Sequence, residues 1–182
     1  MSDDTSSSLR LVVAPLAEPL TLAQAKTFLR IEHSADDEPL TRAIIAARVA
    51  AEQHIRLALM PQTWDYSVAN PASDKLRLPC GPAQSIVSIT LTTEAGASSV
   101  MNAASYRLSV DGFSVLFSTP ISIEKITIRY VAGIANAIAD IPTAIIQGML
   151  HHITVILENR DGDVPLPMQA VTCYAPFRRI SL

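Results

Sequence analysis

The sequence is poor in charged residues. They make up 17% of its 182 residues, against roughly 25% in an average soluble protein, whereas 49% are hydrophobic. A chain this apolar either enters a membrane or buries much of its surface against partners. No apolar run reaches the length of about 20 residues that a membrane helix needs. The longest candidate, residues 141–157, contains Pro142, Gln147 and two histidines. We therefore expect contacts with other protein subunits and no membrane segment.

Cysteine and positive charge are also scarce. Cys80 and Cys173 stand alone without a CxxC pattern, which predicts no disulfide framework and no zinc site, and is typical of a reducing cytosol. The net charge of −3 argues against a regulator that grips DNA tightly. Residues 1–10 are rich in Asp and Ser and lack an apolar core, so we expect a disordered tail and no signal peptide.

Two helices are predicted near the N-terminus. Thr21 and Gln24 form a capping box in front of a short amphipathic helix from Leu22 to about Ile31. A second, alanine-rich helix is capped by Asp36 or Asp37 and runs to about residue 59. Its apolar stripe comprises Leu40, Ile44, Ala47, Ala51 and Ile55.

The second helix also carries a row of charges, Arg48, Glu52 and Arg56, at i,i+4 spacing. Such a row is usually a solvated face, because exposed pairs contribute little. The alternative interpretation is an ion-pair ladder between subunits.

Residues 61–133 change to the period of two that is typical of strands. Turn residues such as Asp111-Gly112 separate the apolar stretches, and this pair predicts a hairpin. The predicted strands are Thr63–Val68, Lys75–Leu78, Ser85–Thr93, Ser98–Asn102, Tyr106–Val110, Ser114–Phe117 and Lys125–Tyr130.

A last helix is predicted from Pro142 to about Asn159, with a stop near Asp161-Gly162. Its wide apolar face needs covering on more than one side, which favours neighbouring subunits. A narrow polar stripe lies opposite and comprises Thr143, Gln147, His151, Thr154 and Glu158. We expect Gln147, His151 and Thr154 to contribute to a subunit interface together with Arg48, Glu52 and Arg56.

The C-terminal segment from residue 163 contains three prolines and is expected to be irregular and extended. It ends with an aromatic–arginine cluster, which is the composition of an anchoring peptide. The cluster comprises Tyr174, Phe177, Arg178 and Arg179.

Catalytic motifs are missing. His151 and His152 point about 100° apart on a helix, so with Glu158 they make a poor metal site, although a small metal-dependent hydrolase is the enzymatic alternative. Cys80 lies in a proline–glycine turn with no base suggested nearby, and Asp161-Gly162-Asp163 is only a fragment of a calcium loop. We expect no catalytic residue, no metal and no cofactor.

Several stretches in order resemble the bacteriophage head–tail connector (adaptor) family, which also occurs in gene transfer agents. Residues 134–137 replace the usual glycine-rich run and are a local departure. The matching stretches are Pro19–Lys26 with Leu29-Arg30-Ile31, the acidic break before the long helix, Met60–Trp64, Leu78-Pro79 to Ser85-Ile86, Ile126–Gly133, and Ile141-Pro142 to Leu157–Arg160.

The resemblance implies a structural subunit of a virion neck, assembled in the host bacterial cytoplasm. Such subunits form a ring of about twelve copies between the portal and the stopper or tail, and DNA passes non-specifically through the channel. In similar proteins the C-terminal segment docks onto the portal, and here Tyr174, Phe177, Arg178 and Arg179 are the candidates. Another neck or tail-completion protein is the nearest alternative.

The expected fold is α+β: a helical frame with an inserted antiparallel β-module and an extended C-terminal tail. The expected division is a tail over 1–17, a helical connector domain over 18–60 and 140–160, a β-module over 61–134, and a docking tail over 161–182.

Overall fold

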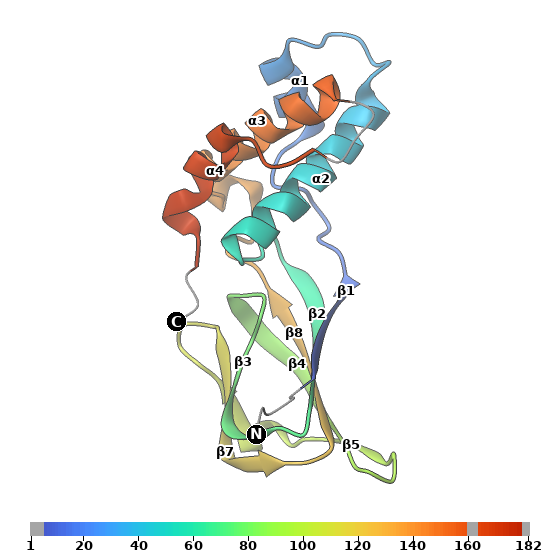
Figure 1. Ribbon diagram of the computed structural model, residues 1–182, viewed down its shortest axis with the longest axis vertical. Coiled ribbons are helices and arrows are strands. Elements are labelled where there is room, and N and C mark those ends of the chain that lie inside the picture. Colours follow the sequence, from blue (N-terminus) through green and yellow to red (C-terminus); the bar gives the residue numbers. More distant parts are fainter. Residues whose placement is uncertain (1–5, 160–163, 180–182) are drawn as a thin grey trace. The chain divides into compact units, whose positions relative to one another are not determined.

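The computed structural model describes residues 6–159 and 164–179, and these divide into two compact units (Figure 1). The β-unit comprises residues 1–16 and 61–134, and the helical unit comprises residues 17–60 and 135–182. The α+β class predicted from the sequence is confirmed. The predicted helix stop at Asp161-Gly162 lies outside the described residues.

The helical unit contains α1 (Leu22–Leu29), α2 (Asp37–Ile55), α3 (Thr143–Glu158) and α4 (Met168–Tyr174), with short 3₁₀ turns at Ile138–Asp140 and Ala175–Phe177. The predicted capping box begins α1: Thr21 Oγ1 accepts from the Gln24 N–H at 3.2 Å, and Gln24 Oε1 accepts from the Thr21 N–H at 2.9 Å. The predicted apolar stripe of α2 is buried throughout. Asp36 occupies the N-cap position of α2, and no side-chain capping bond forms there.

The covering of α3 differs from the expectation. The chain itself supplies two covers, because α2 packs on one side of α3 and α4 on another. Six α3 residues are buried, and its other apolar residues are half-buried except Ala144. The apolar width of α3 therefore does not by itself require neighbouring subunits. The segment that forms α4 was expected to be an extended tail, so this cover of α3 was not predicted.

The prolines that suggested an irregular tail instead border helical structure. Pro167 takes the N-cap position of α4, and Pro176 lies in the first turn of the 3₁₀ segment. Proline is tolerated at both places because the first N–H groups of a helix have no partner within it. Figure 1 shows α4 lying along α3.

The described residues of the β-unit form eight strands. They are β1 (Ser7–Val13), β2 (Gln62–Ala69), β3 (Ala72–Arg77), β4 (Ala83–Thr92), β5 (Ser98–Val100), β6 (Tyr106–Leu108), β7 (Ser114–Ser122) and β8 (Lys125–Ala132). A 3₁₀ turn at Ala103–Ser105 precedes β6. All seven predicted strands are confirmed, with shifted ends. The predicted β6–β7 hairpin is confirmed, and Gly112 in its turn has a φ of +72°.

The strands form two sheets, and every pairing is antiparallel. The larger sheet has the order β1-β2-β8-β4-β5 and the smaller one the order β3-β7-β6. In Figure 1, β2, β8 and β4 run side by side. The core of this unit is built from alternate residues of β8, namely Ile126, Ile128, Tyr130 and Ala132, together with Val115 and Phe117 of β7.

The expected disordered N-terminal tail is wrong over Ser7–Val13, which forms β1 at the edge of the larger sheet. Leu9 and Leu11 alternate with Ser8 and Arg10, so a short strand signal was present. The serine- and aspartate-rich residues before it masked this signal. The strand pairs with β2, which begins more than fifty residues later in the sequence.

Candidate functional site

Arg48 lies at the centre of a buried ion network in the helical unit. Its Nε donates to Glu18 at 2.7 Å and its Nη1 donates to Glu52 at 2.8 Å, while only 5% of its side chain is exposed. Glu52 also accepts the Leu59 N–H at 2.8 Å. Burial opposes the charged form of Arg48, but hydrogen bonds and charge from the two carboxylates raise its pKa overall.

The interpretation of this row as a solvated face is therefore wrong for Arg48 and Glu52, whereas Arg56 is exposed. Arg48 and Glu52 bind within their own subunit, and Arg56 caps α2 in the left-handed conformation, with a φ of +61°. These contacts give all three residues a role in the subunit fold. The hypothesis of a subunit interface then rests on the polar stripe of α3.

In the polar stripe of α3, Gln147, His151 and Thr154 are half-buried, whereas Thr143 and Glu158 are exposed. The Gln147 amide donates to His151 Nε2 at 3.2 Å, and Thr154 Oγ1 donates to the Leu150 carbonyl at 3.0 Å. The ring of Phe28 in α1 meets the His151 ring edge-to-face, with the centroids 6.2 Å apart. Phe28 remains 41% exposed. The stripe thus borders an aromatic side chain that still faces solvent.

His151 and His152 have different surroundings. His152 is 3% exposed, and its Nε2 faces the Val164 carbonyl at 3.5 Å. Within residues 6–159 and 164–179, no three His, Cys, Asp or Glu side chains are grouped as a metal site requires. The same residues include no helix with the length and apolar content to cross a membrane. The calcium-loop fragment Asp161-Gly162-Asp163 lies outside them.

Burial lowers the pKa of His152, which makes the stability of the helical unit depend on pH. The unfolded chain takes up a proton below the ordinary value of about 6.5, whereas the folded chain resists it. The free energy of unfolding should be insensitive to this group above that value. It should decrease as the pH falls from there through the lowered pKa.

Urea unfolding at about pH 7.5 and about pH 5.5 tests this dependence. His152→Gln should reduce the loss of stability at the lower pH, because Gln stays neutral and can donate to Val164. His33→Gln, at a side chain that is 63% exposed, is the control and should preserve the loss. An identical pH response in His152→Gln and the parent chain would rule out this role for His152.

The four predicted docking residues separate into two groups. Tyr174 is fully buried over Gly148 of α3, and its ring lies 6.0 Å from that of His54. Burial raises the pKa of Tyr174. This residue holds α4 in place, which differs from the expected role as an exposed anchor. Arg178 is exposed, whereas Phe177 and Arg179 are half-buried, and the Arg179 N–H donates to the Ile55 carbonyl at 3.0 Å.

Two apolar side chains on the outer face of α2 remain in solvent. Ile45 is 42% exposed and Val49 is 38% exposed, and they lie one turn apart. With Phe28 of α1 they are the large hydrophobic residues most exposed on these two helices. Neighbouring apolar residues that remain exposed often mark a surface that another protein contacts.

The β-unit carries a charged cluster across three neighbouring strands. Arg129 of β8 donates to Asp65 of β2 through Nε at 2.7 Å and Nη2 at 2.8 Å, and Arg10 of β1 donates to the same carboxylate at 2.9 Å. Hydrogen bonds from Arg129 lower the pKa of Asp65 most strongly, despite its burial. The Arg10 side chain is 72% exposed. Two arginines thus share one carboxylate and leave an excess positive charge on this face.

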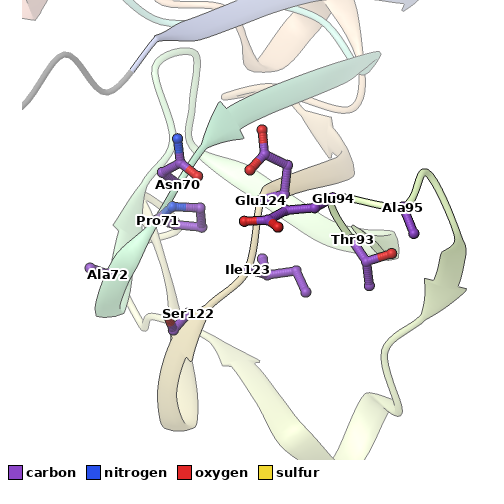
Figure 2. Close-up of a pocket in the computed structure, with 9 residues that line it drawn as sticks. All are labelled: Asn70, Pro71, Ala72, Thr93, Glu94, Ala95, Ser122, Ile123 and Glu124. Atoms are coloured by element: carbon purple, nitrogen blue, oxygen red, sulfur yellow. The ribbon is translucent and has the colours of Figure 1, made fainter.

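A pocket of about 440 Å³ lies among three turns of the β-unit, residues 70–72, 93–95 and 122–124 (Figure 2). Glu94 and Glu124 are among the nine lining residues that Figure 2 labels. None of the nine residues drawn there is a histidine or a cation, and the Thr93 hydroxyl donates to the Ala97 carbonyl at 3.4 Å. Cys80 and Cys173 are half-buried and are not joined in a disulfide. This pocket lacks the constellation that nucleophilic catalysis needs.

Sequence reasoning missed two contributors to these surfaces. Glu18 completes the Arg48 network from thirty residues away, and no local pattern pairs the two. The edge strand β1 was missed although the alternation of Leu9 and Leu11 was a usable signal.

Comparison with known proteins gives one family match: the model of head completion proteins matches residues 18–153. No curated protein sequence matches the chain.

Solved structures share the fold over nearly the whole chain. A chain from the neck of an empty gene transfer agent (GTA) particle, computed with C6 symmetry, has a TM-score of 0.82, 20% identity and coverage of 96% of this chain and 97% of that one. A chain from the virion of a native GTA particle has a TM-score of 0.80 and 21% identity, and the match covers 96% of this chain and 96% of that one. A chain from the neck of a native GTA particle, computed with C12 symmetry, has a TM-score of 0.67 and 20% identity. The match covers 96% of this chain and 97% of that one.

Proposed function

Because this chain belongs to the head completion protein family, we propose that it acts in the neck of a phage-like particle, as one subunit of a ring joining the portal to the stopper or tail. The family match confirms the resemblance drawn from the sequence. It also makes the chain a structural protein of head completion and not an enzyme. The match over residues 18–153 is the observation that carries the proposal.

The proposed ring has about twelve copies. The structural neighbours come from GTA necks treated with C6 and with C12 symmetry, and both orders are compatible with that number. A cyclic ring needs two different contact faces on each subunit. The exposed Ile45 and Val49 on α2, and the half-buried stripe of Gln147, His151 and Thr154 on α3, supply candidate faces.

The ring leaves a channel through which DNA passes. The net charge of −3 suits this role, because a strongly basic channel would hold the phosphate backbone and slow its movement. The chain would be located in the particle neck after assembly in the host cytoplasm. Particles purified away from cytosol should contain the chain in stoichiometric amounts, measured by quantitative mass spectrometry. A chain found in cytosol and never in particles would contradict the proposal.

Portal docking is assigned to Phe177, Arg178 and Arg179, and Tyr174 supports them by holding α4. Arg178→Glu should lower the fraction of heads that carry this chain by about tenfold, the scale of one interface arginine. Arg107→Glu makes the same charge change at an exposed residue of β6 and serves as the control. Mass spectrometry of purified heads gives the readout, and equal incorporation of the two variants would remove Arg178 from the docking site.

A further inference from the structure

Among the strands that the structure describes, β1 pairs with β2 alone and forms an edge of the larger sheet. The Ala69 N–H donates to the Ser6 carbonyl at 2.9 Å, which fixes which residues of this antiparallel ladder exchange hydrogen bonds. In this register the backbone N–H and C=O groups of Ser8 and Arg10 point toward β2. The N–H and C=O groups of Ser7, Leu9 and Leu11 therefore point away from the sheet. They form an unpaired row that another strand can join.

The hydrophobic face of the sheet continues onto this edge. Leu9 lies beside Tyr66 in the register, and Leu11 lies beside Trp64. β8, which pairs with β2 on its other side, carries fully buried core residues opposite the same two β2 residues. Leu9 and Leu11 themselves remain 38% and 40% exposed. The apolar layer thus ends at an exposed margin that one further strand would cover.

Proteins usually protect such edges with bulges, charges, proline or very short strands. β1 has seven residues, no proline and one charged residue, and its single irregularity lies near its end, between Leu11 and Val13. Within residues 6–159 and 164–179, no feature of this kind protects the edge.

At the opposite edge of the same sheet, formed by β4 and β5, other segments of the chain bind to the backbone of β4. The Ala83 N–H at the start of β4 donates to the Gly112 carbonyl at 2.7 Å, and the Met101 N–H donates to the Ile89 carbonyl at 2.8 Å. Two bulges interrupt β4 between these points, and β5, beyond it, has only three residues.

The edges of the smaller sheet are protected too. β6 has three residues, and β3 contains a bulge and the charged residues Asp74, Lys75 and Arg77. Neighbouring copies in a cyclic ring meet through two different faces, and the described strands offer no second edge that matches β1. A second copy is therefore a poor occupant, and a strand from a different protein is the better one.

The charge at this edge indicates what that strand carries. Arg10 and Arg129 share the single carboxylate of Asp65, and Arg10 projects largely into solvent on the face opposite Leu9 and Leu11. An incoming strand that places a carboxylate opposite Arg10 would balance the charge, and apolar residues at the positions on either side would cover the two leucines.

We propose that β1 is a strand-addition site, which an extended segment of a different neck protein joins, with a carboxylate facing Arg10 and apolar residues beside Leu9 and Leu11. The inference rests on the proposed function only in taking the particle neck as the place where the partner is met. Main-chain hydrogen bonds supply the attachment, and the alternation of side chains supplies the specificity.

Photocrosslinking in assembled particles tests the proposal. The full chain carries p-benzoylphenylalanine in place of Leu11 or, as a matched control, in place of Val100, which is 71% exposed on β5. Position 11 should give an adduct with one segment of one other particle protein, and that segment should alternate apolar residues with an acidic one. Position 100 should not give this adduct.

Hydrogen exchange on the unmodified chain gives an independent readout. The outward-facing amides of Leu9 and Leu11 should exchange at least about tenfold more slowly in particles than in the free chain, whereas Ser8 and Arg10 are already bonded to β2. Leu9→Pro removes one outward donor without removing a β1–β2 bond, and should lower the adduct yield at position 11 by about fivefold or more. Leu9→Ala retains the donor and is its control.

An adduct with a second copy of this chain would overturn the proposal, as would incorporated chains that show neither adduct nor slowed exchange. A chain that never enters particles would instead contradict the proposed function. The two failures are therefore distinguishable.

Discussion

Replacing Arg48 by Met is expected to lower the free energy of unfolding by about 3–5 kcal/mol, the usual cost of removing one partner from a buried ion pair. Glu18 and Glu52 would lose their shared cation, and the side chain of Glu52 is only 10% exposed. Met preserves most of the length of the Arg side chain, so the loss of charge dominates the change. Urea unfolding followed by circular dichroism measures the difference.

Arg42→Met is the matched control. Arg42 pairs with Glu38 at the same i,i+4 spacing on the same helix, but both side chains are exposed. Its replacement should change the free energy of unfolding by less than about 0.5 kcal/mol. Equal effects of the two substitutions would show that Arg48 is no more important than a surface ion pair.

The second large effect is expected from Gly148→Val. A Cβ atom at Gly148 would lie 2.4 Å and 2.8 Å from two ring carbons of Tyr174, which is itself fully buried. The ring cannot move aside without shifting α4, so we expect a loss of about 3 kcal/mol in the free energy of unfolding. The amides of α4 should exchange faster in this variant, which hydrogen exchange with mass spectrometry would detect.

Ala144→Val provides the comparison for Gly148→Val, because Ala144 is exposed on the same helix. It should cost less than about 0.7 kcal/mol, the scale of helix propensity alone. Combining Gly148→Val with Tyr174→Ala should relieve the clash, so the two changes should be strongly non-additive. Additive effects would mean that the contact between Gly148 and Tyr174 does not hold α4.

Local sequence patterns predicted the elements whose stabilising contacts are also local. The Thr21–Gln24 capping box spans three residues and forms as expected. The stripe from Leu40 to Ile55 repeats at helical spacing and is buried. The seven predicted strands were recognisable because alternation and turn residues such as Asp111-Gly112 lie close together in the sequence.

The elements that were missed depend on distant partners. β1 forms because it pairs with β2 at the sheet edge, and its alternation of polar and apolar residues covers only Ser8 to Leu11. α4 exists because Tyr174 fits over Gly148, where a side chain is lacking. Neither partnership is visible from the spacing of residues along the chain.

The contacts of the candidate site residues were also missed where their partners are distant in the sequence. The Arg48 row suggested a surface because its i,i+4 spacing was visible, whereas Glu18 was too far away in the sequence to enter the argument. Tyr174 was grouped with Arg178 by proximity in the sequence, although the fold buries one and exposes the other. Composition and spacing along the chain could not distinguish residues in the core of the subunit from residues on its outer surface.

A cryo-electron microscopy reconstruction of the particle neck tests the central claim most directly. The account predicts a ring of this chain directly below the portal, with Phe177, Arg178 and Arg179 of each copy turned toward the portal. A reconstruction in which that ring consists entirely of other proteins, and in which this chain has no density in the neck, would contradict it.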